Sequence, residues 1–190
     1  ISNKLTQDQI NFINQSWDER LVLVFKKQSL DDHKLINFSK YFGELDPPGP
    51  NPYGITFLPE FPEINVISNV KNEQGTPIGN LGDGEAVWHA DMTYLQLPPM
   101  AGILYALEVP ENQGNTHFAN MAIAYNELPN KLKEKIDDKI LIHDSAHNSA
   151  GMLRKGYSEV DNPYETPGAR HPMVITDKNT NKKLLFLGRR

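Results

Sequence analysis

Near its middle the chain reads Trp88-His89-Ala90-Asp91-Met92-Thr93-Tyr94. Polar and apolar residues alternate along this run, which predicts a β-strand at about residues 86–94. Successive side chains of a strand point to opposite faces, so we expect His89, Asp91 and Thr93 to share one face. The opposite face is apolar enough to lie in a core and consists of Trp88, Ala90, Met92 and Tyr94.

An imidazole and a carboxylate two positions apart on one strand face can bind a single metal ion. With a second His from elsewhere, His89 and Asp91 would form the facial triad of non-haem Fe(II) oxygenases, which leaves coordination positions open. A structural zinc site is instead closed and tetrahedral. The pattern is short, and a surface pair or a simple His–Asp hydrogen bond is the alternative. The Gly-rich loop that precedes it, residues 72–84, favours a site at a barrel mouth.

Composition narrows the classes of protein to consider. The 190 residues carry 19 Lys and Arg against 24 Asp and Glu, a formal net charge of −5, whereas a nucleic-acid binder needs a basic face. Cys is absent, which excludes disulfides, Cys-ligated metal centres and thiol nucleophiles and fits a cytoplasmic location. No apolar stretch approaches the ~20 residues of a membrane helix. Any metal must therefore be held mainly by His and carboxylates.

Helices are predicted at the front of the chain and again in its second half. Thr6 and Gln9 have the spacing of a capping box, and the apolar residues that follow predict a helix at about 6–18. An apolar run at 21–25 predicts a buried strand. Ser29 is expected to cap a second helix, and a third is expected at about 121–136.

Strands are predicted to dominate the second half. They are expected at 63–70, 86–94, 101–109, 115–120 and 139–143, and in a hairpin that pairs 173–176 with 183–187. Long polar loops at 47–62, 71–84 and 144–171 have the length typical of binding loops or lids. The pattern predicts one α+β, mainly β domain over residues 1–190, with helices outside a β-sandwich or open barrel. The jelly roll is the natural candidate.

The run at 88–94 resembles the core motif of the taurine dioxygenase family of Fe(II)/2-oxoglutarate-dependent oxygenases, which includes 2,4-dichlorophenoxyacetate dioxygenase. The resemblance covers nearly the whole chain and implies the family fold, a double-stranded β-helix of the jelly-roll type. The other segments that match are Tyr41-Phe42-Gly43-Glu44-Leu45, Pro98-Pro99, Leu107-Glu108-Val109-Pro110, Gly114-Asn115-Thr116, Phe118-Ala119-Asn120-Met121, Ala124-Tyr125, Leu128-Pro129, His171-Pro172 and Leu185-Phe186-Leu187.

This resemblance implies roles for five residues. His89 and Asp91 match two iron ligands and so are the expected catalytic, metal-binding residues. Thr116 matches the threonine that contacts 2-oxoglutarate, although without the motif it would be an ordinary β-branched strand residue. Glu85 and Tyr94 match positions near the substrate pocket, with a loop charge and a core aromatic residue as the alternatives.

Other features of the family have no match in the chain. Its third iron ligand, a His, and the Arg that pairs with 2-oxoglutarate lie far downstream of the His-Xaa-Asp pair, and we expect both beyond Arg190. The chain is therefore expected to be an incomplete portion of the domain, without its first strands and its C-terminal part. Taurine is in doubt as substrate because 46–50 lacks the His of taurine-binding members and Ser145 replaces an aromatic residue.

The resemblance implies an Fe(II)/2-oxoglutarate-dependent dioxygenase. It would oxidise a C–H bond of a small organic acid with O2 and release succinate and CO2. The alternative is a non-catalytic or differently metallated jelly-roll binding protein, since His and Asp also bind Mn or Zn. The expected partners are the small acid and further copies of the chain in a homo-oligomer, with no nucleic acid and no membrane.

Overall fold

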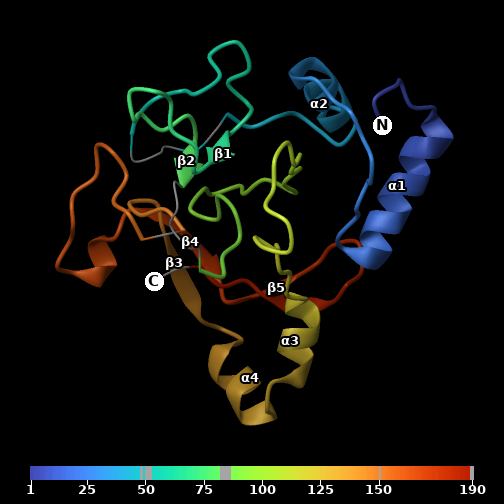
Figure 1. Cartoon of the computed structure of the whole chain (residues 1–190). Helices are drawn as coiled ribbons and strands as arrows, with labels where there is room; N and C mark the ends of the chain where they lie inside the picture. Colours follow the sequence, from blue (N-terminus) through green and yellow to red (C-terminus); the bar gives the residue numbers. More distant parts are fainter. Residues whose placement is uncertain (48, 50–52, 82–86, 150, 189–190) are drawn as a thin grey trace. The chain divides into compact units, whose positions relative to one another are not determined.

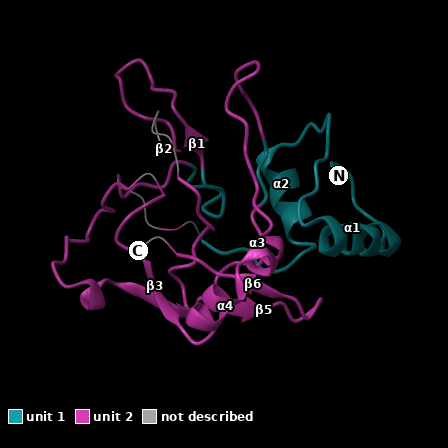
Figure 2. Cartoon of the chain, turned by 90° about the horizontal axis from the view of Figure 1, so that it is seen from below, with its two compact units in different colours: residues 1–48, 58–65, 103–105 teal, residues 49–57, 66–102, 106–190 magenta. Residues whose placement is uncertain are grey.

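The structure, a computed structural model, describes residues 1–47, 49, 53–81, 87–149 and 151–188 (Figure 1). It divides the chain into two compact units (Figure 2). The first contains residues 1–48, 58–65 and 103–105, and the second contains 49–57, 66–102 and 106–190. No helix in the described part is long and apolar enough to cross a membrane. The expectation of a single domain stays a prediction.

The first unit contains two helices, α1 (Gln7–Arg20) and α2 (Asp32–Ser39). The predicted capping box at the start of α1 is confirmed, because Thr6 and Gln9 each accept the other's backbone amide through the side chain. The second predicted cap was two residues too early. The side chain of Asp31, not Ser29, accepts the backbone amide of Lys34 and begins α2.

Aromatic residues form the core of the first unit. Phe38 is 3% exposed, and its ring meets those of Phe25 and Phe42 edge-on at centroid distances of 5.6 and 5.2 Å. Phe25 thus joins a core, but the predicted strand at 21–25 is wrong because that segment forms no β-ladder. An apolar run becomes a strand only where another segment offers its backbone groups.

The second unit contains the described strands, in three two-stranded sheets. Strands β1 (Ile67–Ser68) and β2 (Asn80–Leu81) are parallel. Strands β3 (Ile140–Asp144) and β4 (Gly168–Pro172) are antiparallel, as are β5 (Val174–Thr176) and β6 (Lys183–Leu185). The predicted strand at 139–143 and the predicted hairpin at 173–187 are therefore confirmed in substance.

The helices of this unit are α3 (Met121–Glu127), α4 (Asn130–Ile136) and a short 3₁₀ turn, Pro163–Glu165. The single helix predicted at 121–136 is split at Pro129, which has no amide to donate. Proline also disfavours a helical residue before it, and Leu128 accordingly has an extended ψ of 140°.

Several other predicted strands are wrong. The segments 101–109, 115–120 and 87–94 have no strand structure, and the one predicted at 63–70 is reduced to β1. In contrast, β4 begins inside the predicted loop at 144–171. The fold contains helices and few strands, so the described residues are α+β but not mainly β, and they do not form the two facing sheets of a jelly roll.

The register of β3 and β4 brings two histidines together. Leu141 lies opposite His171, and His143 lies opposite Ala169. Opposite residues of an antiparallel pair point to the same face, and residues two apart on one strand share a face. His143 and His171 therefore project from the same face of this sheet, and both are buried.

Candidate metal and substrate site

The structure brings His89 and Asp91 together. The Nε2 atom of His89 lies 3.2 Å from Oδ1 of Asp91, and both residues are exposed. The Nδ1 atom of His89 lies 2.7 Å from the backbone oxygen of Val87. The imidazole is thus held from its far side by the backbone while its other nitrogen faces a carboxylate.

This arrangement fits a bound cation. A carbonyl oxygen can only accept, so Nδ1 of His89 donates its proton to Val87. In the neutral ring, Nε2 then carries a lone pair that faces the carboxylate of Asp91. Two electron-pair donors at 3.2 Å require a proton or a metal ion between them. A backbone carbonyl that fixes the far nitrogen is the usual support of a metal-binding His.

The distance also suits a shared metal ion. Imidazole and carboxylate ligands bind at ~2.1 Å, so two ligands at a right angle lie about 3 Å apart. His89 and Asp91 are at this spacing in the described structure. No group of three His, Asp, Glu or Cys side chains that could hold a metal forms among the residues that the structure describes.

Asp91 stands on a turn and His89 in the irregular segment before it, not on the predicted strand. Residues 91–94 form the turn, Met92 has a positive φ of 49°, and the Leu95 amide donates to the Met92 carbonyl at 3.0 Å. The predicted alternation of faces is therefore wrong. Trp88, expected in the core, is 69% exposed, whereas Thr93, expected beside the metal ligands, is buried.

Strand β4 bonds to the end of this turn. The Ala169 amide donates to the Tyr94 carbonyl at 2.9 Å. The Nε2 atom of His171 lies 3.0 Å from the Thr93 oxygen and 2.9 Å from the Leu95 oxygen. Because both oxygens can only accept, Nε2 carries the proton and donates to both.

Tyr94 is half-buried beside Arg154. The guanidinium carbon of Arg154 lies 4.3 Å from the centre of the Tyr94 ring, a cation–π contact. Burial raises the pKa of the Tyr94 hydroxyl; the nearby Arg154 charge opposes this rise, and the negative charge of Asp91 adds to it. The hydroxyl has no hydrogen-bond partner among the described residues.

The other two expected site residues are not joined to this group. Thr116 is exposed and lies outside regular secondary structure, and the described contacts do not link it to His89 or Asp91. Glu85 lies outside the described residues. Their roles stay predictions.

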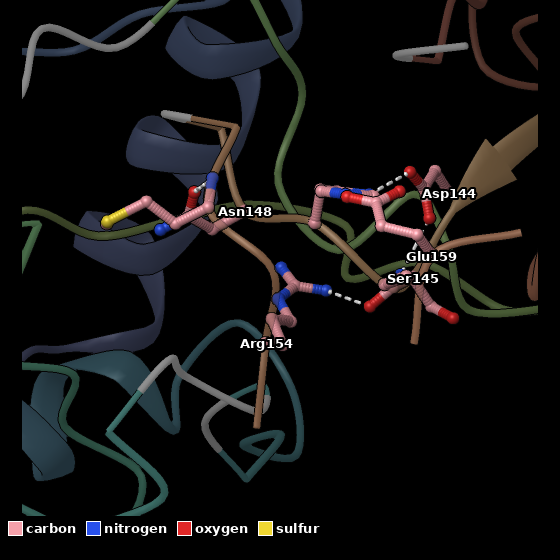
Figure 3. Close-up of polar contacts among 8 residues, drawn as sticks. Asp144, Ser145, Asn148, Arg154 and Glu159 are labelled. Atoms are coloured by element: carbon pink, nitrogen blue, oxygen red, sulfur yellow. Dashed lines mark hydrogen bonds and ion pairs between the residues drawn. The ribbon is translucent and has the colours of Figure 1, made fainter. Parts of the chain in front are cut away.

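The predicted loop at 144–171 contains an ordered polar cluster (Figure 3). The His147 ring lies between two carboxylates, with Nδ1 at 2.7 Å from Asp144 and Nε2 at 3.0 Å from Glu159. Both contacts are hydrogen bonds only when both ring nitrogens carry protons. Arg154 donates from Nη1 to the Ser145 carbonyl at 2.9 Å and from its amide to the Ala146 carbonyl at 2.7 Å.

His143 and His171, on one face of the β3–β4 sheet, form an aromatic cluster with Phe186. His143 is 1% exposed; its ring stacks on Phe186 at 5.0 Å and meets His171 edge-on at 4.9 Å. Burial lowers the pKa of His143, and the charge of His171 lowers it further. Neither ring nitrogen has a hydrogen-bond partner among the described residues.

Sequence reasoning missed the roles of His171 and Arg154. The sequence shows His171 only as part of a matching His-Pro pair and gives no signal for Arg154, because both contact residues more than fifty positions away. A buried His on a strand with polar neighbours is a weak signal. The alternation of Ala169, Arg170 and His171 was the available clue to the inward face of β4.

Comparison with known proteins identifies the class. The family model described as "Taurine catabolism dioxygenase TauD, TfdA family" matches residues 1–190. The chain belongs to this family, and the expected resemblance is confirmed.

Particular relatives give the scale of the likeness. An alkylsulfatase of Acinetobacter baylyi is 28% identical over 99% of this chain and 57% of its own length. An alpha-ketoglutarate-dependent 2,4-dichlorophenoxyacetate dioxygenase of a Burkholderia species is 25% identical over 99% of this chain and 65% of its own length. The chain thus spans less than two thirds of either protein.

A solved structure supports the fold. The crystal structure of AAD-2 in complex with Mn(II) and N-oxalylglycine matches with a TM-score of 0.62, over 98% of this chain and 62% of that one. The identity is 21%, so this likeness concerns the fold alone.

Proposed function

We propose that the whole protein is an Fe(II)/2-oxoglutarate-dependent dioxygenase that oxidises a C–H bond of a small organic acid. Substrate, 2-oxoglutarate and O2 would give the hydroxylated acid, succinate and CO2. The observation that carries the proposal is the pair of His89 and Asp91, whose facing donor atoms lie 3.2 Å apart. Membership of the taurine dioxygenase family supports the same chemistry.

The residues of the chain would have separate roles in binding the iron, 2-oxoglutarate and the substrate. His89 and Asp91 would hold the iron, and the Val87 carbonyl would keep the His89 ring turned toward it. Thr116 would contact 2-oxoglutarate, while Tyr94 and Glu85 would line the substrate pocket. When bound, the iron would supply the activation of oxygen, and the protein would supply orientation and the exclusion of water. The third ligand and the Arg for 2-oxoglutarate are proposed to lie beyond Arg190, within a complete double-stranded β-helix.

The substrate class rests on the relatives. Their names include a sulfatase and a phenoxyacetate dioxygenase, and both sulfate esters and phenoxyacetates are small acids. Taurine is the less favoured candidate, since the sequence around 46–50 and Ser145 departs from the taurine-binding pattern. A homo-oligomer and a cytoplasmic location stay predictions.

Release of succinate tests the proposal. Purified protein is incubated with Fe(II), ascorbate, 2-oxoglutarate and a panel of sulfate esters, sulfonates and aryloxy acids. We expect at least one acid to raise succinate above the level without substrate. The hydroxylated product of that acid, or a fragment of it, should appear in the same reaction. The variant His89→Ala should lose this succinate release. His117→Ala, which removes another exposed imidazole, is its matched control. Binding of a metal without any succinate would favour the non-catalytic binding protein instead.

A further inference from the structure

We propose that His171 is a positioning residue that fixes the turn carrying Asp91. The inference rests on the proposed metal site, because it explains how one ligand of that site is held in place. His171 itself touches neither Asp91 nor His89 in the described contacts. Its effect is transmitted through the backbone of residues 93–95.

Three consecutive carbonyl groups of this segment accept hydrogen bonds from β4. The His171 imidazole donates to the oxygens of Thr93 and Leu95 at 3.0 and 2.9 Å. Between them, the Tyr94 oxygen accepts the Ala169 amide at 2.9 Å. A single side chain thus does for two carbonyls what a neighbouring strand would do in a regular sheet.

The turn needs such a restraint. Met92 directly follows Asp91 and has a positive φ of 49°, a conformation that residues other than glycine rarely adopt. The direction of the Asp91 side chain depends on this backbone conformation. Within the turn, the bond from the Leu95 amide to the Met92 carbonyl is local, so the external bonds to β4 stabilise the turn against relaxation.

The environment of His171 keeps it in one orientation. The residue is 8% exposed, and its ring packs edge-on against Phe186 at 5.2 Å and against His143 at 4.9 Å. Rotation of the ring would break both bonds of Nε2 and bury unpaired carbonyl groups, which is costly. The imidazole is therefore a rigidly held hydrogen-bond donor from β4 to the end of the turn that carries Asp91.

His143 provides a matched control. It lies on the same face of the same sheet, in the same aromatic cluster, and is buried at least as deeply. Unlike the ring of His171, the ring of His143 makes no hydrogen bond to the described residues. Replacement of either His by Leu therefore perturbs the same core, but only the His171 variant releases the carbonyls of the turn.

The experiment compares wild type, His171→Leu, His171→Gln and His143→Leu. Hydrogen–deuterium exchange is followed in peptides covering residues 89–97, without metal. We expect faster exchange there in His171→Leu, with partial recovery in His171→Gln, which keeps an N–H donor. His143→Leu should leave these peptides unchanged. Equal exchange in the two Leu variants would overturn the proposal.

Binding of Mn(II), measured by titration calorimetry, gives the second measurement. Loss of a residue that orients a ligand typically costs about 10–100-fold in metal affinity, and we expect a loss of that size in His171→Leu only. Unchanged Mn(II) affinity in a variant with faster exchange would also overturn the proposal. If wild type binds no Mn(II), the proposed function fails, while the exchange comparison still decides whether His171 holds the turn. If His171→Leu does not fold, His171→Asn, too short to reach both carbonyls, replaces it.

Discussion

Nε2 of His89 lies 3.2 Å from Oδ1 of Asp91, while Nδ1 of the same ring is held by the Val87 carbonyl at 2.7 Å. Both atoms are electron-pair donors, so this contact requires a proton or a metal ion between them. The relationship therefore links the local geometry directly to a measurable property, metal binding.

Substitution of either residue should abolish binding of a divalent metal. Because His89 and Asp91 are exposed, His89→Ala and Asp91→Ala should leave the fold intact, with circular dichroism and thermal unfolding close to wild type. Mn(II) titration calorimetry and succinate release measure the loss. Asp161→Ala, another exposed carboxylate, should bind as wild type does. Full metal affinity or turnover in His89→Ala or Asp91→Ala would contradict the assignment.

Removal of the Thr116 hydroxyl should weaken 2-oxoglutarate binding. One lost hydrogen bond is worth about 0.5–1.5 kcal/mol, so Thr116→Ala should raise the KM for 2-oxoglutarate by roughly 2–10-fold. Thr116→Ser keeps the hydroxyl and should stay close to wild type. An unchanged KM in the Ala variant would remove Thr116 from the site.

The two carboxylates on His147 should differ in energetic weight. The Asp144 side chain is 2% exposed and that of Glu159 is 65% exposed. Substitution of His147 by Leu removes the ring partner of the buried Asp144, whose Oδ1 atom still accepts the Ala146 amide at 2.7 Å, and should cost about 1–3 kcal/mol of unfolding free energy. Glu159→Gln should cost less than about 1 kcal/mol.

Denaturant unfolding of the two variants tests this difference, and limited proteolysis within 145–159 should be faster in His147→Leu. Similar losses of stability in both variants would show that the loop does not depend on the buried half of the cluster (Figure 3).

His143 should make the protein less stable in acid. Burial and the nearby His171 lower its pKa below the ordinary value of 6.5. As the pH falls below 6.5, the unfolded chain binds a proton at this position before the folded chain does. The free energy of unfolding therefore falls with pH, by at most about 1.4 kcal/mol per pH unit from this one group.

His143→Leu removes this contribution, so its stability should fall less than that of wild type between pH 7 and pH 5. Urea unfolding at both pH values gives the comparison, and parallel losses in the two proteins would count against a neutral buried His143. At neutral pH the variant should lose little, since Leu replaces polar atoms that lack partners in the described structure.

Local patterns in the sequence predicted local structure well. The capping box of Thr6 and Gln9 and the hairpin of β5 and β6 depend on residues a few positions apart. The break at Pro129 is equally local and could have been predicted from the proline itself. In each case, the chemistry of a short segment is enough to decide its conformation.

Strands were harder to predict because they need partners. The apolar run at 21–25 and the alternating run at 88–94 both have the composition of a strand, yet neither finds a ladder among the described residues. Burial followed the same logic. Trp88 is exposed and Thr93 is buried because a turn at Met92 replaces the regular alternation.

The amino-acid sequence alone was sufficient to assign the family and to point to His89 and Asp91, since the spacing of a ligand pair is written in consecutive residues. Tertiary structure alone decided which distant residue bonds to the turn that carries Asp91. The bonds from His171 to Thr93 and Leu95 span 78 and 76 positions. A contact at such separation depends on how the chain folds back on itself, and its energy comes from burial and hydrogen-bond geometry that no short segment contains.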